Sequence, residues 1–267
     1  AGTPTGFMGA LSGQVVAANP AALTLAESRA AAATFLSPDD LRAATAQARG
    51  FAAMNPPTIA DPLAEASVAE SQGDMKQAAQ LMAQAVAQED RAEDWTNLAR
   101  LTLYTSDTDS SDSAQATASM AANGYLRASH DAVAAKALSW LAMADERLNR
   151  GNDALAALRL AAKLAPGDAE IASALEESQA RNGMRVTDTQ IEADGRLPRF
   201  CAVLSRDLEK GRDYAPFLRL PQGDLTVEAE GNRICVAGLS HGQNVQITLR
   251  AGLPAGDGET LARDVTL

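Results

Sequence analysis

The chain has 267 residues, of which 46% are hydrophobic, 4% aromatic and 21% charged, and its net charge is −11. This length allows one or two domains with a real core, and the negative charge argues against a general binder of nucleic acid or of an anionic membrane. Two His and two Cys are a poor set for a metal site or for a nucleophile with its base, so we start from a protein that is not an enzyme and needs no cofactor.

Alanine divides the chain into two parts of different composition. Residues 1–182 hold 50 alanines, with 22 Asp and Glu against 13 Lys and Arg, whereas residues 183–267 hold 8 alanines. Alanine favours helix because it loses no side-chain entropy there, and the later part instead alternates apolar with polar residues between Gly and Pro. We therefore expect an α+β protein made of two separate domains, the helical one first.

Residues 1–59 are expected to form a lead-in with Ala-rich helices. Four glycines make residues 1–18 a loose segment, and a helix follows from Pro20 to Phe35. Ser37 is placed to cap a second helix, with Pro38 at its first position and two acidic residues in its first turn.

Residues 60–182 repeat a helical pattern. Gly73 begins a turn followed by a helix of small and large residues, and residues 154–166 repeat that spacing. Trp95 and Trp140 each begin a segment in which the aromatic residue is followed, after two residues, by a large apolar residue and then a small one. These segments resemble tetratricopeptide repeats, in which paired helices approach closely, and some other helical bundle is the alternative.

The tetratricopeptide resemblance implies three helical pairs and a role for particular side chains. Ala85 and Ala161 would lie at close helix–helix contacts, and the rings of Trp95 and Trp140 would be buried between helices of the array. Such an array is a stacking surface without intrinsic chemistry, so its function would be binding.

The Ser- and Asp-rich segment Thr105–Ser113 interrupts the second pair. Closely spaced carboxylates can bind calcium, but Ala118 stands where an EF-hand loop has its closing Glu. We favour a solvated loop whose last Asp or Ser caps a helix that begins near Ala114, with calcium as the alternative.

From Met184 onward the period changes to two. Glu230-Gly231-Asn232 is a hairpin turn between two of the alternating segments, and Asp188 makes the first segment the weakest because it breaks the alternation. A small antiparallel β-sandwich is therefore predicted for residues 183–267. The alternating segments lie at 184–186, 200–204, 225–229, 234–236 and 245–249.

Cys201 and Cys235 fall on two of these predicted strands. They are either a free buried pair or a disulfide, and two cysteines in one domain of secreted appearance favour the disulfide, which places the protein outside the reducing cytosol. A metal site lacks ligands, because only His241 lies in the same domain. In its tight turn between strands, His241 is expected to hold the backbone through a ring nitrogen.

Three signals in the β part are specific in combination: the Cys pair, the Gly-Leu-Ser-His-Gly turn and the Leu-Arg-Ala-Gly-Leu-Pro segment. They lie within residues 198–208, 213–220, 233–242 and 248–266. Together they resemble the first macroglobulin-like domain of bacterial alpha-2-macroglobulin family proteins. Generic bacterial immunoglobulin-like domains are the competing assignment. In the alpha-2-macroglobulin family a helical repeat-like segment precedes this domain, so the resemblance covers about residues 60–267.

The resemblance implies a periplasmic protein, anchored to the inner membrane through a lipid that this chain does not carry. Its implied partners are the remaining macroglobulin domains of a longer parent, the proteases that it entraps and a peptidoglycan synthase; no nucleic acid is implied. The family's thioester needs Cys-x-Glu-Gln, and neither Cys201 nor Cys235 stands in that motif. We therefore expect a non-catalytic recognition and scaffold fragment of a protease inhibitor. A free-standing periplasmic adaptor is the alternative.

Overall fold

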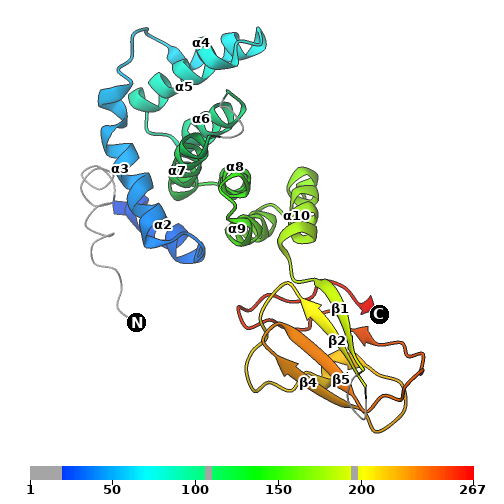
Figure 1. Ribbon diagram of the computed structural model, residues 1–267. Helices are drawn as coiled ribbons and strands as arrows, with labels where there is room; N and C mark the ends of the chain where they lie inside the picture. Colours follow the sequence, from blue (N-terminus) through cyan, green and yellow to red (C-terminus); the bar gives the residue numbers. More distant parts are fainter. Residues whose placement is uncertain (1–19, 106–109, 194–197) are drawn as a thin grey trace. The chain divides into compact units, whose positions relative to one another are not determined.

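A computed structural model of the protein describes residues 20–105, 110–193 and 198–267 (Figure 1). The chain divides into two compact units between Ser178 and Gln179. The first unit is helical and the second is built from small antiparallel sheets, which confirms the expected fold class. Within the described ranges, every helix is too short or too polar to cross a bilayer. The loose segment predicted for residues 1–18 lies outside those ranges.

The described helices form an array in which sequence neighbours pack on one another from α4 to α9. Helix α6 also contacts α8, which is not its neighbour in sequence. The interfaces are lined mainly by alanine and leucine, which lets the helix backbones approach closely. The bounds are α2 Pro20–Ala32, α3 Pro38–Met54, α4 Pro62–Ser71, α5 Met75–Gln88, α6 Ala92–Thr105, α7 Ser111–Arg127, α8 Asp131–Arg147, α9 Gly151–Leu164 and α10 Ala169–Asn182.

The helix starts follow from short polar side chains. At α3 the predicted cap is confirmed: the Ser37 hydroxyl accepts the backbone N–H of Asp40, and the Asp40 carboxylate accepts the N–H of Ser37. At α7 the start expected near Ala114 is wrong by one turn. The Ser110 hydroxyl accepts the N–H of Ser113, so the helix begins at Ser111.

The first two described helices are part of the packed array. Helix α2 packs on α7, and α3 packs on both α5 and α7. Two hydrogen bonds join these helices to α7: a buried one from Asn123 Nδ2 to the Ala44 carbonyl at 2.9 Å, and a partly buried one from the Tyr125 hydroxyl to the Arg29 carbonyl at 2.9 Å. On the other side of α7, a Cβ at Gly124 would lie 2.5 Å from the Thr96 hydroxyl, so the α6–α7 approach requires glycine there.

The second unit contains a four-stranded sheet of order β1-β2-β5-β4 and a three-stranded sheet of order β3-β6-β7, with antiparallel neighbours in both. Residues from both sheets bury one common hydrophobic cluster, among them Leu204 and Ile234 from the first sheet and Leu249 from the second. The unit is therefore a small sandwich. The bounds are β1 Val186–Glu192, β2 Arg199–Leu204, β3 Leu218–Arg219, β4 Thr226–Glu230, β5 Arg233–Ala237, β6 Thr248–Leu249 and β7 Val265–Thr266.

The hairpin and two of the strands of this unit can be compared with those predicted from the sequence. The hairpin is confirmed, since β4 and β5 are joined through Gly231 and Asn232, with Gly231 at a φ of 58°. The weak first segment is a full strand, and the register shifts between Val186 and Asp188, so a β-bulge explains the broken alternation. The strand expected over 245–249 is shorter, and only its last two residues form β6.

Candidate functional site

The disulfide joins Cys201 and Cys235, which lie directly opposite each other on β2 and β5 with their Cα atoms 4.0 Å apart. The neighbouring pair, Ala202 and Ile234, points into the core. Because side chains alternate along a strand, the sulfurs lie on the opposite, outer face of the sheet. The disulfide favoured by the sequence is therefore present, but outside the sandwich core. Such a bond is typical of proteins outside the reducing cytosol.

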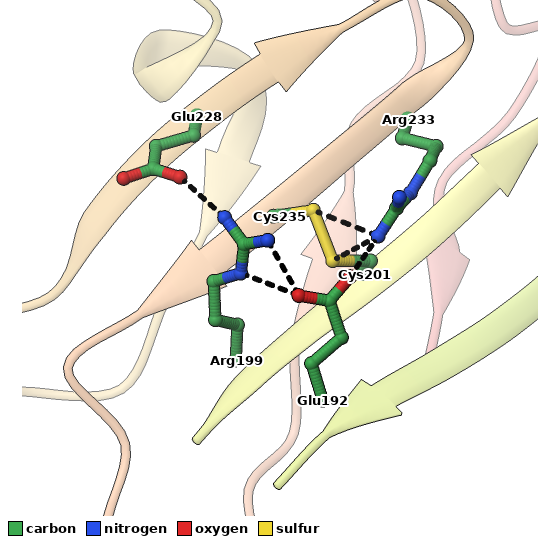
Figure 2. The surroundings of a disulfide bond; sticks show 6 residues. All are labelled: Glu192, Arg199, Cys201, Glu228, Arg233 and Cys235. Carbon is green, nitrogen blue, oxygen red and sulfur yellow. Dashed lines mark hydrogen bonds and ion pairs between the residues drawn. A yellow bond between two sulfur atoms is a disulfide. The ribbon is translucent and has the colours of Figure 1, made fainter. Parts of the chain in front are cut away.

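An ionic layer covers the two sulfurs on that outer face (Figure 2). Arg233 Nη2 lies 3.3 Å from Cys201 Sγ and also binds a carboxylate oxygen of Glu192. Arg199 Nε donates to Glu192 at 2.8 Å, and the hydrogen bonds from Arg199 and Arg233 lower the pKa of Glu192. The cover leaves Cys201 fully buried and Cys235 only 7% exposed. Figure 2 labels Glu192, Arg199, Cys201, Glu228, Arg233 and Cys235.

The two-residue spacing between each arginine and its cysteine is a sequence signal for this ionic cover, and it was not among the predicted features. Arg199 and Cys201 are two residues apart on β2, and Arg233 and Cys235 are two residues apart on β5. The period of a strand puts each arginine on the same face as its cysteine. The arrangement protects a structural bond, because cysteines this deeply buried give an attacking thiolate little access to the sulfurs.

Trp95 on α6 is buried, with 1% of its surface exposed. Its indole N–H donates to Asp90 at 2.6 Å, its ring lies 4.7 Å from the Phe51 ring, and the Arg127 guanidinium lies 5.5 Å from the indole centroid. The indole is thus satisfied at its polar end and enclosed elsewhere, which makes it part of the core of the array.

Ala85 and Ala161 are both buried, at 4% and 0% exposure. Ala85 lies on α5 in a cluster with residues of α3, α4 and α6, and Ala161 lies on α9 in the cluster shared by α2, α3, α7 and α8. Both therefore occupy positions where helices meet.

Trp140 on α8 is only partly buried, unlike Trp95. Its ring meets the Tyr104 ring of α6 edge to face, with centroids 5.8 Å apart. Tyr104 is 60% exposed and Met143 is 43% exposed. We call the solvent-facing area built on these side chains the α6–α8 surface; it consists of Tyr104, Lys136, Trp140, Met143 and Arg147.

A cluster of charged side chains links α3 to the turn between α8 and α9. Arg150 bridges Asp40 at 2.8 Å and Asp145 at 2.9 Å. Burial away from water raises the pKa of Asp145 to about 7, against the opposing charge of Arg150. Partial burial pushes the pKa of Asp40 upward, but hydrogen bonds from Ser37 and Arg150 hold it below its usual value.

His241 does not hold its turn in the way expected from the sequence. The turn is closed by the Gln243 N–H, which donates to the Ser240 carbonyl at 3.1 Å, and by the Gln243 side chain, which accepts the Ser240 N–H at 3.0 Å. The His241 side chain is exposed and makes no hydrogen bond to the described part of the chain. It lies beside an open hollow of about 390 Å³ that Ile191 and Phe200 also line.

No group of three or more His, Cys, Asp or Glu residues is placed to hold a metal ion within residues 20–105, 110–193 and 198–267. Asp107 and Asp109 of the possible calcium loop lie outside these ranges, and Asp112 lies in the first turn of α7.

The comparisons with known proteins include a distant likeness to a solved structure. No model of a protein family matches the chain, and no curated protein matches it. Among solved structures, the N-terminal part of the bacterial S-layer protein SbsC matches with a TM-score of 0.27 and 13% identity over 85% of this chain. The match covers 56% of that protein's chain, so this chain spans little more than half of its length. A TM-score this low does not establish a common fold.

Proposed function

We propose that the chain is a non-catalytic recognition and scaffold segment from the N-terminal part of a periplasmic, alpha-2-macroglobulin-like protease inhibitor. The observation that carries this proposal is the arrangement of the segments behind the resemblance. Residues 198–208, 213–220, 233–242 and 248–266 fall into one sandwich, with the Cys pair joined across β2 and β5 and a helical array before it.

The scaffold role follows from what the two units offer chemically. The helical array presents packed faces and an exposed aromatic area, and the sandwich is held by an ion-covered disulfide. Neither Cys201 nor Cys235 stands in the thioester motif that covalent capture needs. The remaining macroglobulin domains of a parent chain are the partners that this function requires.

A protease assay tests the proposal. The purified chain is incubated with a broad-specificity protease, and residual activity is measured on a large protein substrate and on a small peptide. We expect no inhibition and no covalent adduct from the chain alone, and protection against the large substrate only from a parent that continues in further sandwich domains. Near-stoichiometric inhibition by residues 1–267, or a reading frame that ends soon after Leu267, would contradict it.

A second candidate is an adaptor that binds an envelope protein through its helices. The exposed Tyr104 ring beside Trp140 favours it, because aromatic side chains are enriched in protein interfaces. The adaptor requires an envelope protein to be retained by the chain and lost when Tyr104 is replaced by Ser. The inhibitor scaffold has no such requirement.

A further inference from the structure

The α6–α8 surface exposes large, mainly apolar side chains to solvent. The Tyr104 ring is 60% exposed and is braced by the edge-to-face contact with Trp140, 5.8 Å away. Met143 adds a flexible thioether one turn further along α8 and is 43% exposed. A side chain already held in place loses less freedom on binding, and Tyr, Trp and Met are residue types that interfaces favour.

Positive charge flanks these side chains along α8. Lys136, Trp140, Met143 and Arg147 follow one another at intervals of four, three and four residues, so they form one stripe on the helix. Arg147 Nη1 donates to the Leu103 carbonyl at 2.9 Å, which anchors the guanidinium beside α6. The stripe therefore has a cation at each end and apolar side chains between them.

Neither of these two cations is neutralised by a neighbouring acidic side chain in the part of the chain that the structure describes. No carboxylate of the described residues forms an ion pair with Lys136 or Arg147, although acidic residues outnumber basic ones in the protein by 34 to 23. Lys136 shares this with Lys76 and Lys163, which also form no ion pair with the described residues. Arg147 differs from six other arginines of the helical unit, which are paired with carboxylates: Arg29, Arg42, Arg91, Arg100, Arg127 and Arg150. Unpaired cations beside exposed aromatic side chains are complementary to an acidic ligand.

The distance between the two cations also determines the length of an acidic ligand that could contact both. Lys136 and Arg147 are eleven residues apart in α8, which is about 16 Å along a helix axis. An extended polypeptide covers this distance with about five residues. The matching segment thus carries acidic side chains at both ends and a large apolar side chain between them.

We propose that the α6–α8 surface docks an acidic segment of another polypeptide, with an apolar side chain of that segment against Tyr104, Trp140 and Met143. This inference rests on the proposed scaffold function and names its recognition surface. A second copy of the chain is a different occupant, which the experiment below separates.

Peptide selection tests the proposal on the full chain. A random peptide library is selected against the immobilised protein, and the dissociation constant of the most enriched peptide is measured by fluorescence anisotropy. We expect enriched peptides to combine Asp or Glu with Leu, Phe or Trp. Met143→Asp is expected to raise the dissociation constant at least about tenfold, because it puts a carboxylate at the centre of the contact. Lys136→Glu is expected to weaken binding several-fold, and less at high salt.

Matched variants outside the surface serve as controls. Met54→Asp changes another exposed methionine, at 68% exposure, and Lys76→Glu changes another exposed lysine. Both are expected to leave the dissociation constant unchanged. All four substitutions replace exposed side chains, so circular dichroism spectra are expected to superimpose on that of the unchanged protein.

Several results would overturn the proposal: no enrichment, enriched peptides that are neutral or basic, or equal effects of the substitutions at Met143 and Met54. Sedimentation that shows a dimer lost on Met143→Asp would assign the surface to a second copy instead. The protease assay does not depend on this surface, so the scaffold function can stand when the docking proposal fails.

Discussion

Replacing Asp145 by Asn removes one buried titratable group while keeping the shape of the side chain. Asp145 is 3% exposed and lies 2.9 Å from Arg150, with Asp40 on α3, Asp153 on α9 and Glu146 on its own helix as the other charges that act on it. The amide oxygen of Asn can still accept the hydrogen bond from Arg150. The substitution therefore tests the titration of this one group.

The size of the effect follows from the pKa of the carboxyl in the two states. Burial raises it from 3.8 to about 7, about three pH units, which corresponds to about 4 kcal/mol. Between these pH values the folded protein keeps a proton that the unfolded protein has lost. The stabilisation is thus fully present below pH 3.8, decreases as the pH rises and is gone above about pH 7.

The assay is urea unfolding, followed by far-ultraviolet circular dichroism, of the unchanged protein and of Asp145→Asn at a series of pH values from 4 to 8. Since all other titrating groups are common to both proteins, the difference between their free energies of unfolding isolates Asp145. We expect the variant to gain stability relative to the unchanged protein as the pH rises, by up to about 4 kcal/mol in total. A difference that stays constant across this range would refute the reasoning.

Three further predictions concern stability. Reduction of the disulfide, whose cysteines are 34 residues apart, is expected to lower the free energy of unfolding of the second unit by about 3–4 kcal/mol and hence its melting temperature. The helical unit should be unaffected. Two free thiols in the unfolded, unreduced protein would contradict the presence of the disulfide. Ala85→Leu and Ala161→Leu are each expected to lower the free energy of unfolding in urea by about 1–3 kcal/mol, because the larger side chain overpacks the helix interface. Ala64→Leu, at an exposed position of α4, should leave it almost unchanged. Equal effects at all three positions would argue against the packing described. Ser37→Ala is expected to cost about 1 kcal/mol through loss of the α3 cap, and Ser37→Thr to retain most of it, which thermal unfolding measures.

Composition and periodicity were enough to predict the order of helices and strands. The alanine content separated the two units because alanine acts locally, through side-chain entropy, on every helix that contains it. Ser37 was recognised as a cap because capping needs only a hydroxyl three residues before an N–H. The two-residue turn at Gly231 was recognised for a similar reason, since its backbone conformation favours glycine.

What the sequence did not predict depends on contacts between distant segments. The bulge that interrupts β1 at Asp188 is defined only by its pairing with β2, so the sequence alone made that strand look weak. The closure of the 240–243 turn by Gln243 depends on one side-chain conformation, which no periodic pattern encodes.

The same limit applies to the candidate interaction surface. The tetratricopeptide pattern treats Trp95 and Trp140 alike, but only Trp95 has a buried polar partner in Asp90, and Trp140 instead meets the exposed Tyr104. The contact between Trp140 and Tyr104 joins two helices that are not neighbours in sequence, so its exposure could be seen only in the folded chain.

The link between β2 and β5 also determines how the second unit responds to a pulling force. Load applied at the two ends of this unit would pass from Cys201 to Cys235 through the sulfur bridge, and the intervening chain would stay slack even after every strand had separated. Those 34 residues correspond to about 120 Å of extended polypeptide. While the disulfide is intact, a stretched polypeptide that contains this domain therefore extends by about 120 Å less. Reduction of the disulfide would release this additional length in a single step.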